Sequence, residues 1–81
     1  MQPSNRSVEV RFTVDADYME ELKQALGVRT ATEVAQEALT ILKWAIEERQ
    51  RGKQILSADS NGTDLHRLVT PRLQRVGGAA R

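Results

Sequence analysis

The feature that most constrains this chain is a stretch of strict alternation near its N-terminus. Residues 7–14 place apolar side chains at every second position: Val8, Val10, Phe12 and Val14. Period-two alternation of β-branched and aromatic residues predicts a β-strand with one face toward a core. A single strand is not stable by itself, and no neighbouring segment forms a hairpin with this one. The strand must therefore pair with a distant segment or with its own copy in another chain.

The longest periodic segment, residues 30–51, predicts an amphipathic helix. Thr30 followed by Glu33 has the capping-box spacing that starts a helix. At about 100° per residue, the apolar side chains cover roughly 160°, wider than the ~100° stripe that packs on one surface. They are Val34, Ala35, Ala38, Leu39, Ile41, Leu42, Ala45 and Ile46. A wide buried face in a larger monomer is the alternative, but this chain offers little else to cover the face, so we expect a dimer.

Between these two segments the sequence predicts a short helix. Asp15 has the chemistry of an N-cap, and Gly27 stands where a C′ glycine ends a helix. The intervening apolar residues form a compact stripe: Tyr18, Met19, Leu22, Ala25 and Leu26. The expected order is strand, short helix, tight turn and long helix.

Composition narrows the possible functions. Eighty-one residues make one small domain, close to the size at which a single core is marginal. With no cysteine and one histidine, we expect neither a disulfide framework nor a structural zinc. No catalytic constellation is present, so we expect no enzyme and no cofactor. No apolar run approaches the ~18 residues of a membrane span, and we expect a cytoplasmic protein without a membrane partner.

In this order the residues resemble a known family. The segments V-E-V-R-F-T-V-D and G-V-R-T-A-T-E-V-A-Q-E-A-L, across residues 7–50, resemble the ribbon-helix-helix fold of the Arc and MetJ repressors. The resemblance implies an α+β homodimer, in which two strands pair into an antiparallel ribbon and four helices share a core. Such ribbons enter the major groove of double-stranded DNA. Pairing with its own copy would give the lone strand its partner.

The resemblance also assigns the DNA-contacting residues. The outward-facing Glu9, Arg11 and Thr13 match the positions that read base edges. Arg11 is chemically the strongest, because a guanidinium donates bidentately to guanine O6 and N7. Glu9 departs from the family's neutral or basic preference; it can accept from cytosine N4 but opposes the phosphate field. At the start of the long helix, the family clamps a DNA phosphate with the residues that match Arg29, Thr30, Ala31 and Thr32.

The resemblance ends with the long helix. Asn61-Gly62 between two partly apolar runs predicts a β-hairpin. A two-residue turn would place Asp59 opposite Asp64, so we expect a longer loop or a bulge to shift the register. The predicted organisation is a flexible N-terminal arm (1–6), a ribbon-helix-helix domain (7–52), a hairpin extension (53–70) and a mobile tail (71–81). Residues 53–81 carry five basic and two acidic side chains, so this end of the chain is basic.

The sequence therefore predicts a sequence-specific transcriptional regulator, a repressor, that forms a homodimer or a higher-order assembly on DNA. An antitoxin-type protein whose residues 53–81 wrap a partner protein is the alternative, since many members of the family do both. A dimer whose ribbon has lost DNA binding is a third interpretation, suggested by Glu9 and by a net charge of only +1. We also predict that the C-terminal segment folds back, on its own chain or on the partner chain, and packs against Trp44, which lies on the polar side of its helix.

Overall fold

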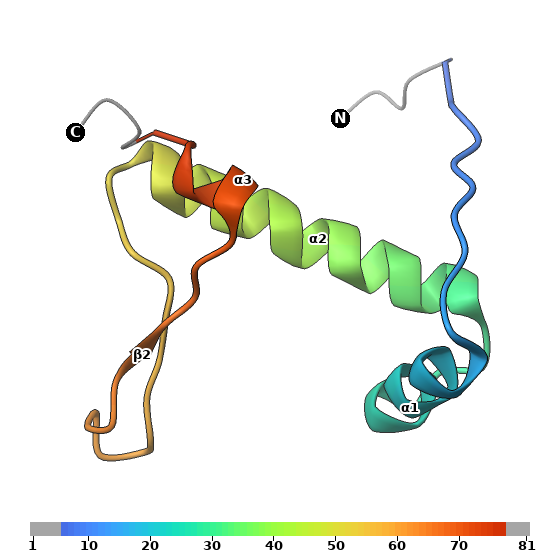
Figure 1. Cartoon of the computed structure of the whole chain (residues 1–81), viewed down its shortest axis with the longest axis horizontal. Coiled ribbons are helices and arrows are strands. Elements are labelled where there is room, and N and C mark those ends of the chain that lie inside the picture. Colours follow the sequence, from blue (N-terminus) through green and yellow to red (C-terminus); the bar gives the residue numbers. More distant parts are fainter. Residues whose placement is uncertain (1–5, 78–81) are drawn as a thin grey trace. The chain divides into compact units, whose positions relative to one another are not determined.

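A computed structural model describes residues 6–77 of the chain (Figure 1). The chain has the α+β composition that the sequence predicts. Its elements follow in the order α1 (Ala16–Leu26), α2 (Ala31–Gln50), β1 (Leu56–Ser57), β2 (His66–Arg67) and α3 (Pro71–Gln74). The chain divides into two compact units, residues 1–34 and residues 35–81.

Helix α1 begins and ends at the residues that the sequence predicts. The Asp15 carboxylate accepts a hydrogen bond from the backbone N–H of Tyr18, at 3.0 Å, and so caps the first turn. At the other end, Gly27 adopts a left-handed conformation with φ 71°. The N–H of Val28 then reaches back to the carbonyl of Lys23, at 3.0 Å. This closure satisfies a C-terminal carbonyl and turns the chain toward α2.

Residues 7–14 run as an extended segment before α1 (Figure 1). No backbone hydrogen bond joins them to another part of residues 6–77. The alternating side chains Val8, Val10 and Phe12 are 84%, 71% and 68% exposed. A strand exists only with a partner, so its pairing with a second copy stays a prediction. Of the predicted N-terminal arm, residues 1–5 lie outside the described residues.

The C-terminal hairpin forms where the Asn-Gly signal predicts it. Strands β1 and β2 pair antiparallel, with Leu56 opposite Arg67 and Ser57 opposite His66. The N–H of Leu68 extends the ladder to the carbonyl of Ile55, at 2.8 Å. In this register Leu56 and Arg67 share one face of the hairpin, and side chains of the flanking pairs share the other.

A bulge changes the register at the tip of the hairpin. There the N–H of Asp59 donates to the carbonyl of Thr63, at 3.0 Å. One residue therefore separates this pair from β1, whereas two separate it from β2. Asp64 is one of those two, and it takes a left-handed conformation with φ 55°. The expected shift is thus present, and it removes the like-charge pairing of Asp59 with Asp64.

The Asp59 carboxylate stabilises the hairpin loop by accepting hydrogen bonds from loop residues. It accepts from the backbone N–H of Asn61 at 3.1 Å, and from the N–H and hydroxyl of Thr63 at 2.8 and 2.7 Å. The hydrogen bonds from Thr63 are the main cause that lowers the pKa of Asp59. Gly62, with φ 78°, supplies the left-handed residue that a three-residue hairpin loop requires.

Helix α3 corrects the sequence prediction, which assigned a mobile tail to residues 71–81. The Thr70 hydroxyl accepts from the N–H of Leu73, at 3.2 Å, and Pro71 occupies the first helical position. Proline is suited to this position because its missing N–H would have had no partner there. The sequence prediction ended the hairpin extension before Pro71 and did not consider that proline also begins helices. Residues 78–81 of the predicted tail lie outside the described residues.

A buried arginine of α2 links this C-terminal segment to the helix by hydrogen bonds. Arg49 is 8% exposed; its Nη1 donates to the carbonyl of Lys53, at 3.1 Å, and its Nη2 to that of Gln74, at 3.3 Å. Its Nε has no hydrogen-bond partner among the described residues. No carboxylate pairs with it there either, so the charge is neutralised only by carbonyl dipoles. One guanidinium thus joins the end of α2, the following loop and α3.

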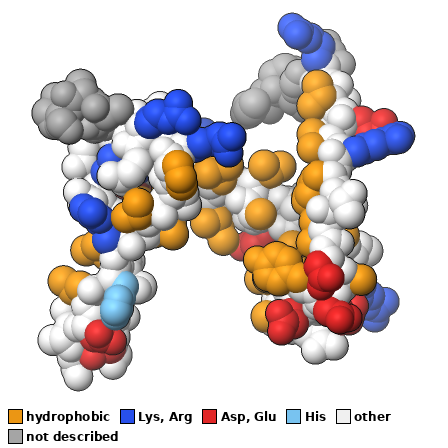
Figure 2. Space-filling view, viewed as in Figure 1, with side chains coloured by type: hydrophobic (Ala, Val, Ile, Leu, Met, Phe, Trp, Pro, Cys, Tyr) orange, Lys and Arg blue, Asp and Glu red, His pale blue; other side chains and the backbone are white. Residues whose placement is uncertain are grey.

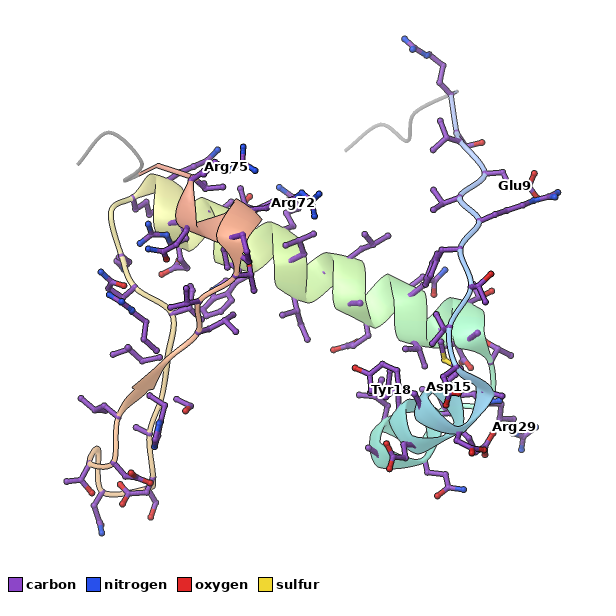
Figure 3. The ribbon with its side chains drawn as sticks, viewed as in Figure 1. Glu9, Asp15, Tyr18, Arg29, Arg72 and Arg75 are labelled. Carbon is purple, nitrogen blue, oxygen red and sulfur yellow. The ribbon has the colours of Figure 1, made fainter. Side chains whose placement is uncertain are left out.

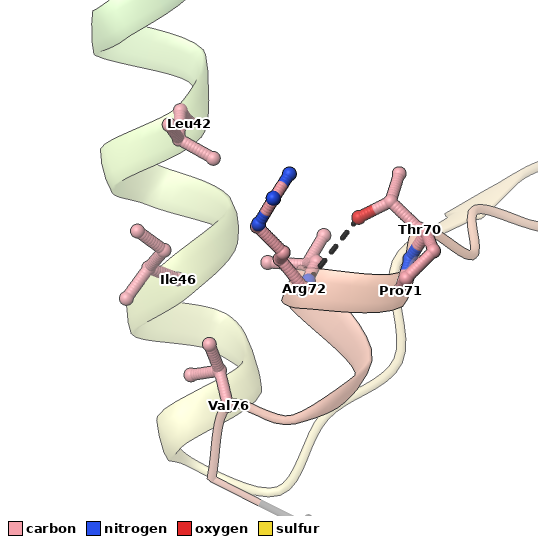
Figure 4. Close-up of a pocket in the computed structure, with 7 residues that line it drawn as sticks. Leu42, Ile46, Thr70, Pro71, Arg72 and Val76 are labelled. Atoms are coloured by element: carbon pink, nitrogen blue, oxygen red, sulfur yellow. Dashed lines mark hydrogen bonds between the residues drawn. The ribbon is translucent and has the colours of Figure 1, made fainter.

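Helix α3 borders an apolar groove along α2 (Figure 4). The groove has a volume of about 370 Å³ and is lined by Leu42, Ile46, Thr70, Pro71, Arg72, Leu73 and Val76. Beyond it, Gly77 approaches the backbone of α2 so closely that a Cβ atom there would overlap the carbonyl oxygen of Arg49. Close packing therefore requires glycine at this position, where φ is also positive, at 64°.

The C-terminal segment folds back onto α2, but along its Leu42 and Ile46 side. Trp44 of the same chain, one of the two predicted contacts, lies on the opposite side of the helix at about 100° per residue, and a contact with Trp44 of a second copy stays a prediction. Trp44 is 51% exposed within the single chain. The segment packs on this side of α2 because Leu42 and Ile46 are apolar there and Arg49, on the same face, hydrogen-bonds to the segment.

Candidate nucleic-acid interface

The three expected base-reading side chains are all found on the extended N-terminal segment. Nη2 of Arg11 lies 3.5 Å from Oε1 of Glu9, and these side chains are 83% and 78% exposed (Figure 3). The two residues stand two positions apart, and in an extended chain that spacing places them on the same face. Thr13 is expected on that face by the same alternation, and within residues 6–77 no side-chain hydrogen bond joins it to the other two.

The Arg11–Glu9 pair changes how Glu9 is interpreted. An ion pair this exposed contributes little to stability, because water screens it and both side chains must be ordered. Arg11 is therefore able to leave Glu9 for a stronger bidentate acceptor such as a guanine edge. In the free chain the carboxylate lies beside the guanidinium, so Glu9 is positioned to restrict the orientations of Arg11.

The second group of predicted residues surrounds the start of α2. Thr30 and Glu33 form the predicted capping box: the N–H of Glu33 donates to the Thr30 hydroxyl, at 3.1 Å, and the N–H of Thr30 donates to the Glu33 carboxylate, at 3.0 Å. The same carboxylate oxygen also accepts from the Thr30 hydroxyl and from the N–H of Arg29, at 3.1 and 3.0 Å. Glu33 therefore fixes the turn between the helices.

These hydrogen bonds hold the pKa of Glu33 below its usual value. The backbone N–H of Arg29 is the largest cause, followed by the N–H and the hydroxyl of Thr30. The consequence for anion binding is direct. The Thr30 hydroxyl already donates its hydrogen to the Glu33 carboxylate. This carboxylate also places a negative charge beside any phosphate that would bind there.

The remaining donors at this helix end belong to Ala31 and Thr32. Neither N–H has a protein acceptor among the described residues. Together with the positive end of the α2 dipole they provide two donors for an anion. The exposed Arg29 side chain has no ion pair among residues 6–77 (Figure 3). The sequence prediction of a phosphate site included Thr30 and did not anticipate the competing carboxylate of Glu33, although the capping-box spacing carried that signal.

The structure brings the predicted residues into two groups. Glu9 and Arg11 touch each other, while Arg29, Thr30, Ala31 and Thr32 follow one another at the turn into α2. No hydrogen bond or ion pair between the groups is found in the described part of the chain. Within one chain, each group is therefore a separate surface.

Charged side chains are unevenly distributed over the molecule (Figure 2). Asp and Glu gather over α1, whose region from residue 15 to 29 carries four acidic and two basic residues. Lys and Arg gather around α3 and the end of α2. Arg72 and Arg75 belong to this basic region, and the sequence prediction did not single them out because it placed them in a tail.

No protein-family model, no curated protein and no solved structure matches the chain. Among the described residues, no group of three or more His, Cys, Asp or Glu side chains is arranged to hold a metal ion. None of the helices within residues 6–77 has the length and apolar character to cross a membrane.

Proposed function

We propose that this chain is a homodimeric, sequence-specific DNA-binding protein of the ribbon-helix-helix type, acting as a repressor of transcription. The observation that carries the proposal is the extended segment of residues 7–14. Its apolar face is exposed and its backbone has no partner within the described chain. A second copy of the same segment offers both an apolar face and a complementary backbone edge.

Pairing of two copies explains the alternation physically. An antiparallel ribbon would satisfy the open backbone donors and acceptors of both segments. It would bury Val8, Val10 and Phe12 on one side, at about 25 cal/mol per Å² of apolar surface removed from water. Arg11 and Thr13 would then stand on the opposite side, in a ribbon narrow enough for the major groove.

The wide apolar face of α2 supports the same proposal. Leu39, Ile41 and Leu42 are large apolar side chains that stay exposed in the single chain. Among the described residues only Val34, Ala45 and Leu73 are buried apolar side chains, too few for a stable core. Helices from a second copy would cover this face, as a shared core requires.

Selection from a random double-stranded DNA pool tests the function. We expect enrichment of a two-fold repeated sequence, because two identical chains present the ribbon with two-fold symmetry. Arg11→Ala should cost about 1–3 kcal/mol per contact at the selected site and relax the base preference there. A pool that yields no repeated sequence at low salt would contradict the proposal.

Arg29→Ala is the matched control, since it removes an equal charge at the expected phosphate site. It should weaken binding to all sequences and flatten the dependence on salt. If both substitutions lower specific and non-specific binding by equal factors, Arg11 does not read bases. In that case the assignment of the ribbon face is wrong even if DNA binding persists.

An antitoxin-type protein that binds a partner protein is the second candidate. It is favoured by the exposed apolar side chains of the hairpin region, Leu56, Leu65, Leu68 and Val69. A wrapping segment is disordered when free and orders on binding. The Arg49 bonds and the capped α3 support the regulator instead, because they hold residues 53–77 without a partner. Amide hydrogen exchange of these residues in the free protein separates the two: protection supports the regulator, and rapid exchange supports the antitoxin.

A further inference from the structure

The tip of the hairpin carries a pair of residues that can react with each other. Asn61 is followed directly by Gly62, and both residues are exposed. The backbone nitrogen of the residue after an asparagine is able to attack the side-chain amide. This attack is fastest before glycine, because no side chain shields the nitrogen. The Asn61 side chain forms no hydrogen bond with another residue in the described chain, so it can turn toward the Gly62 nitrogen.

The reaction consumes only water. The Gly62 nitrogen bonds to Cγ of Asn61 and gives up its proton, and the side-chain nitrogen of Asn61 leaves as ammonia. The product of this step is a cyclic succinimide. Water then opens the ring at one of its carbonyl groups, which leaves aspartate or isoaspartate at position 61. In sum, an amide and a water molecule become a carboxylic acid and ammonia.

The closed loop opposes this attack. The N–H of Gly62 donates to the backbone carbonyl of Asp59, at 3.0 Å. The Asp59 carboxylate accepts from the N–H of Asn61 at 3.1 Å, and from the N–H and hydroxyl of Thr63 at 2.8 and 2.7 Å. These hydrogen bonds fix the backbone on both sides of the bond between Asn61 and Gly62. The one from Gly62 must break before its nitrogen can lose a proton and reach the side chain.

We propose that Asn61 is a site of spontaneous deamidation and that the Asp59 carboxylate controls its rate by holding the loop closed. Because the attack requires an open loop, its rate follows the population of opened hairpins, which the hydrogen bonds to Asp59 keep small. The proposal concerns the hairpin alone. It depends neither on DNA binding nor on the pairing of residues 7–14.

Either product would weaken the hairpin. Isoaspartate adds a carbon atom to the backbone, so the short loop would lose part of its hydrogen bonding to Asp59. Aspartate adds a carboxylate close to those of Asp59 and Asp64, and like charges repel one another. Deamidation would therefore loosen residues 53–70 in an ageing chain and leave the capped helices intact.

Peptide mapping of the full chain tests the site. Trypsin cuts after Lys53 and Arg67, so one fragment contains Asn61, and the other asparagine of the sequence, Asn5, falls in a different fragment. In guanidinium chloride at neutral pH, we expect Asn61 to deamidate faster than Asn5, which precedes the bulkier Arg6. Asn61→Gln should abolish the mass gain in its fragment, because the longer side chain closes a ring far more slowly. Conversion of Asn61 no faster than that of Asn5 overturns the proposal.

Asp59→Ala tests the control by the loop under native conditions. We expect deamidation at least about tenfold faster than in the natural chain, because losing hydrogen bonds to a charged group shifts the opening equilibrium by that factor or more. Thr63→Val removes only the hydroxyl bond and should accelerate the reaction less. Ser60→Ala is the matched control: its side chain makes no hydrogen bond with a described residue, so the rate should not change. Equal rates for Asp59→Ala and the natural chain overturn the proposal.

Amide hydrogen exchange tests the effect on the hairpin. The converted chain carries an added carboxylate and is separated by ion exchange. The N–H of Leu68, bonded to the carbonyl of Ile55 at 2.8 Å, should exchange faster after conversion. The N–H of Val34, bonded to the carbonyl of Thr30 at the start of α2, should not change. Unchanged exchange at Leu68 would overturn the inferred weakening. If Asp59→Ala also exposes Val34, it unfolds the chain, and the acceleration by Thr63→Val then decides whether the loop controls the reaction.

Discussion

The capped helices and the hairpin satisfy their polar groups within the described chain, whereas the backbone of residues 7–14 does not. In the C-terminal unit, Asp59 closes the hairpin loop and Arg49 binds the carbonyls of Lys53 and Gln74. In the N-terminal unit, α1 and the start of α2 are capped in the same local manner. Residues 7–14 differ from both, because their backbone edge and apolar face remain open within the single chain.

This difference indicates which segment the proposed second copy would complete. The hairpin loop and α3 find partners for their polar groups within the same chain, the loop through Asp59 and α3 through Arg49. Residues 7–14 have no such partners within the described chain, and the proposed pairing with a second copy would supply them. Substitutions in the N-terminal segment should therefore act on assembly, and substitutions in the C-terminal unit should act on the stability of the chain itself.

The largest effect is expected from Phe12→Asp. It would place a carboxylate in the apolar side of the proposed ribbon, and it forgoes about 1.5–3 kcal/mol of burial in each copy. The melting temperature of the natural chain should rise with concentration, and this dependence should vanish in the variant. Thr13→Asp, on the other side of the ribbon, is the control and should keep it. A concentration-independent melt of the natural chain would remove the basis of the comparison.

Arg49→Ala should have the next largest effect. It removes two hydrogen bonds from a buried charged group, which we expect to lower the free energy of unfolding by about 2–3 kcal/mol. Urea denaturation measures the loss. Arg51→Ala is the matched control: the Arg51 side chain is 64% exposed and Glu48 keeps Lys53 as a second cation, so the loss should be less than about 1 kcal/mol. Equal losses for the two arginines would show that Arg49 does not anchor the C-terminal unit.

Gly77→Ala tests the close approach of the residue after α3 to the end of α2. Gly77 and Gly52 both have positive φ, so an alanine at either position is strained. Only at Gly77 would the added methyl group overlap the Arg49 carbonyl; at Gly52 no atom lies within 4 Å. Gly77→Ala should therefore cost about 1–2 kcal/mol more than Gly52→Ala in urea denaturation. The same loss at both glycines would mean that the contact does not contribute to stability.

The smallest effect concerns Glu33 and depends on pH. Because its pKa in the folded chain lies below the ordinary value of 4.5, its stabilising contribution is present above pH 4.5 and is lost as the pH falls through the folded pKa. The difference in unfolding free energy between the natural chain and Glu33→Gln should stay constant near neutral pH and shrink in acid. Asp59→Asn controls for a second carboxyl with a lowered pKa, in the hairpin loop, and Glu47→Gln for a third, whose pKa is lowered by the hydrogen bond from Lys43. A difference that persists unchanged in strong acid would exclude the capping carboxylate as its cause.

Local chemistry explains how much of the fold could be predicted from the sequence. The cap residues Asp15 and Thr30 start their helices where the sequence places them, and Asn61-Gly62 marks the hairpin. Each is a signal carried within a few residues. The α3 helix was missed because the prediction ended the hairpin at Pro71 and assigned a tail after it, although Thr70 and Pro71 together have the chemistry of a helix start.

The candidate site was less predictable from the sequence. Its properties depend on contacts between distant residues and on competition between acceptors for the same hydrogen-bond donors. Glu33 was assigned as a cap, but its effect on the neighbouring anion site emerges only from the hydrogen-bond geometry. Arg49 lies within the apolar sector of α2, an unusual place for a charge, and the sequence prediction made no use of it. Its partners are carbonyls at Lys53 and Gln74, the second 25 positions away, and no periodicity encodes such a pair.

The tight loop between Asp59 and Thr63 has a consequence for the order of folding events. Hairpins of this kind form in roughly 1–10 μs, because the ends that meet are only a few residues apart. Ribbon formation would be second order, and at about 1 μM with ordinary association rates it would proceed at roughly 0.1–10 per second. Refolding followed in time should therefore show an early phase independent of protein concentration and a much later phase whose rate increases with concentration. The last step in making the functional molecule would then occur at its first strand.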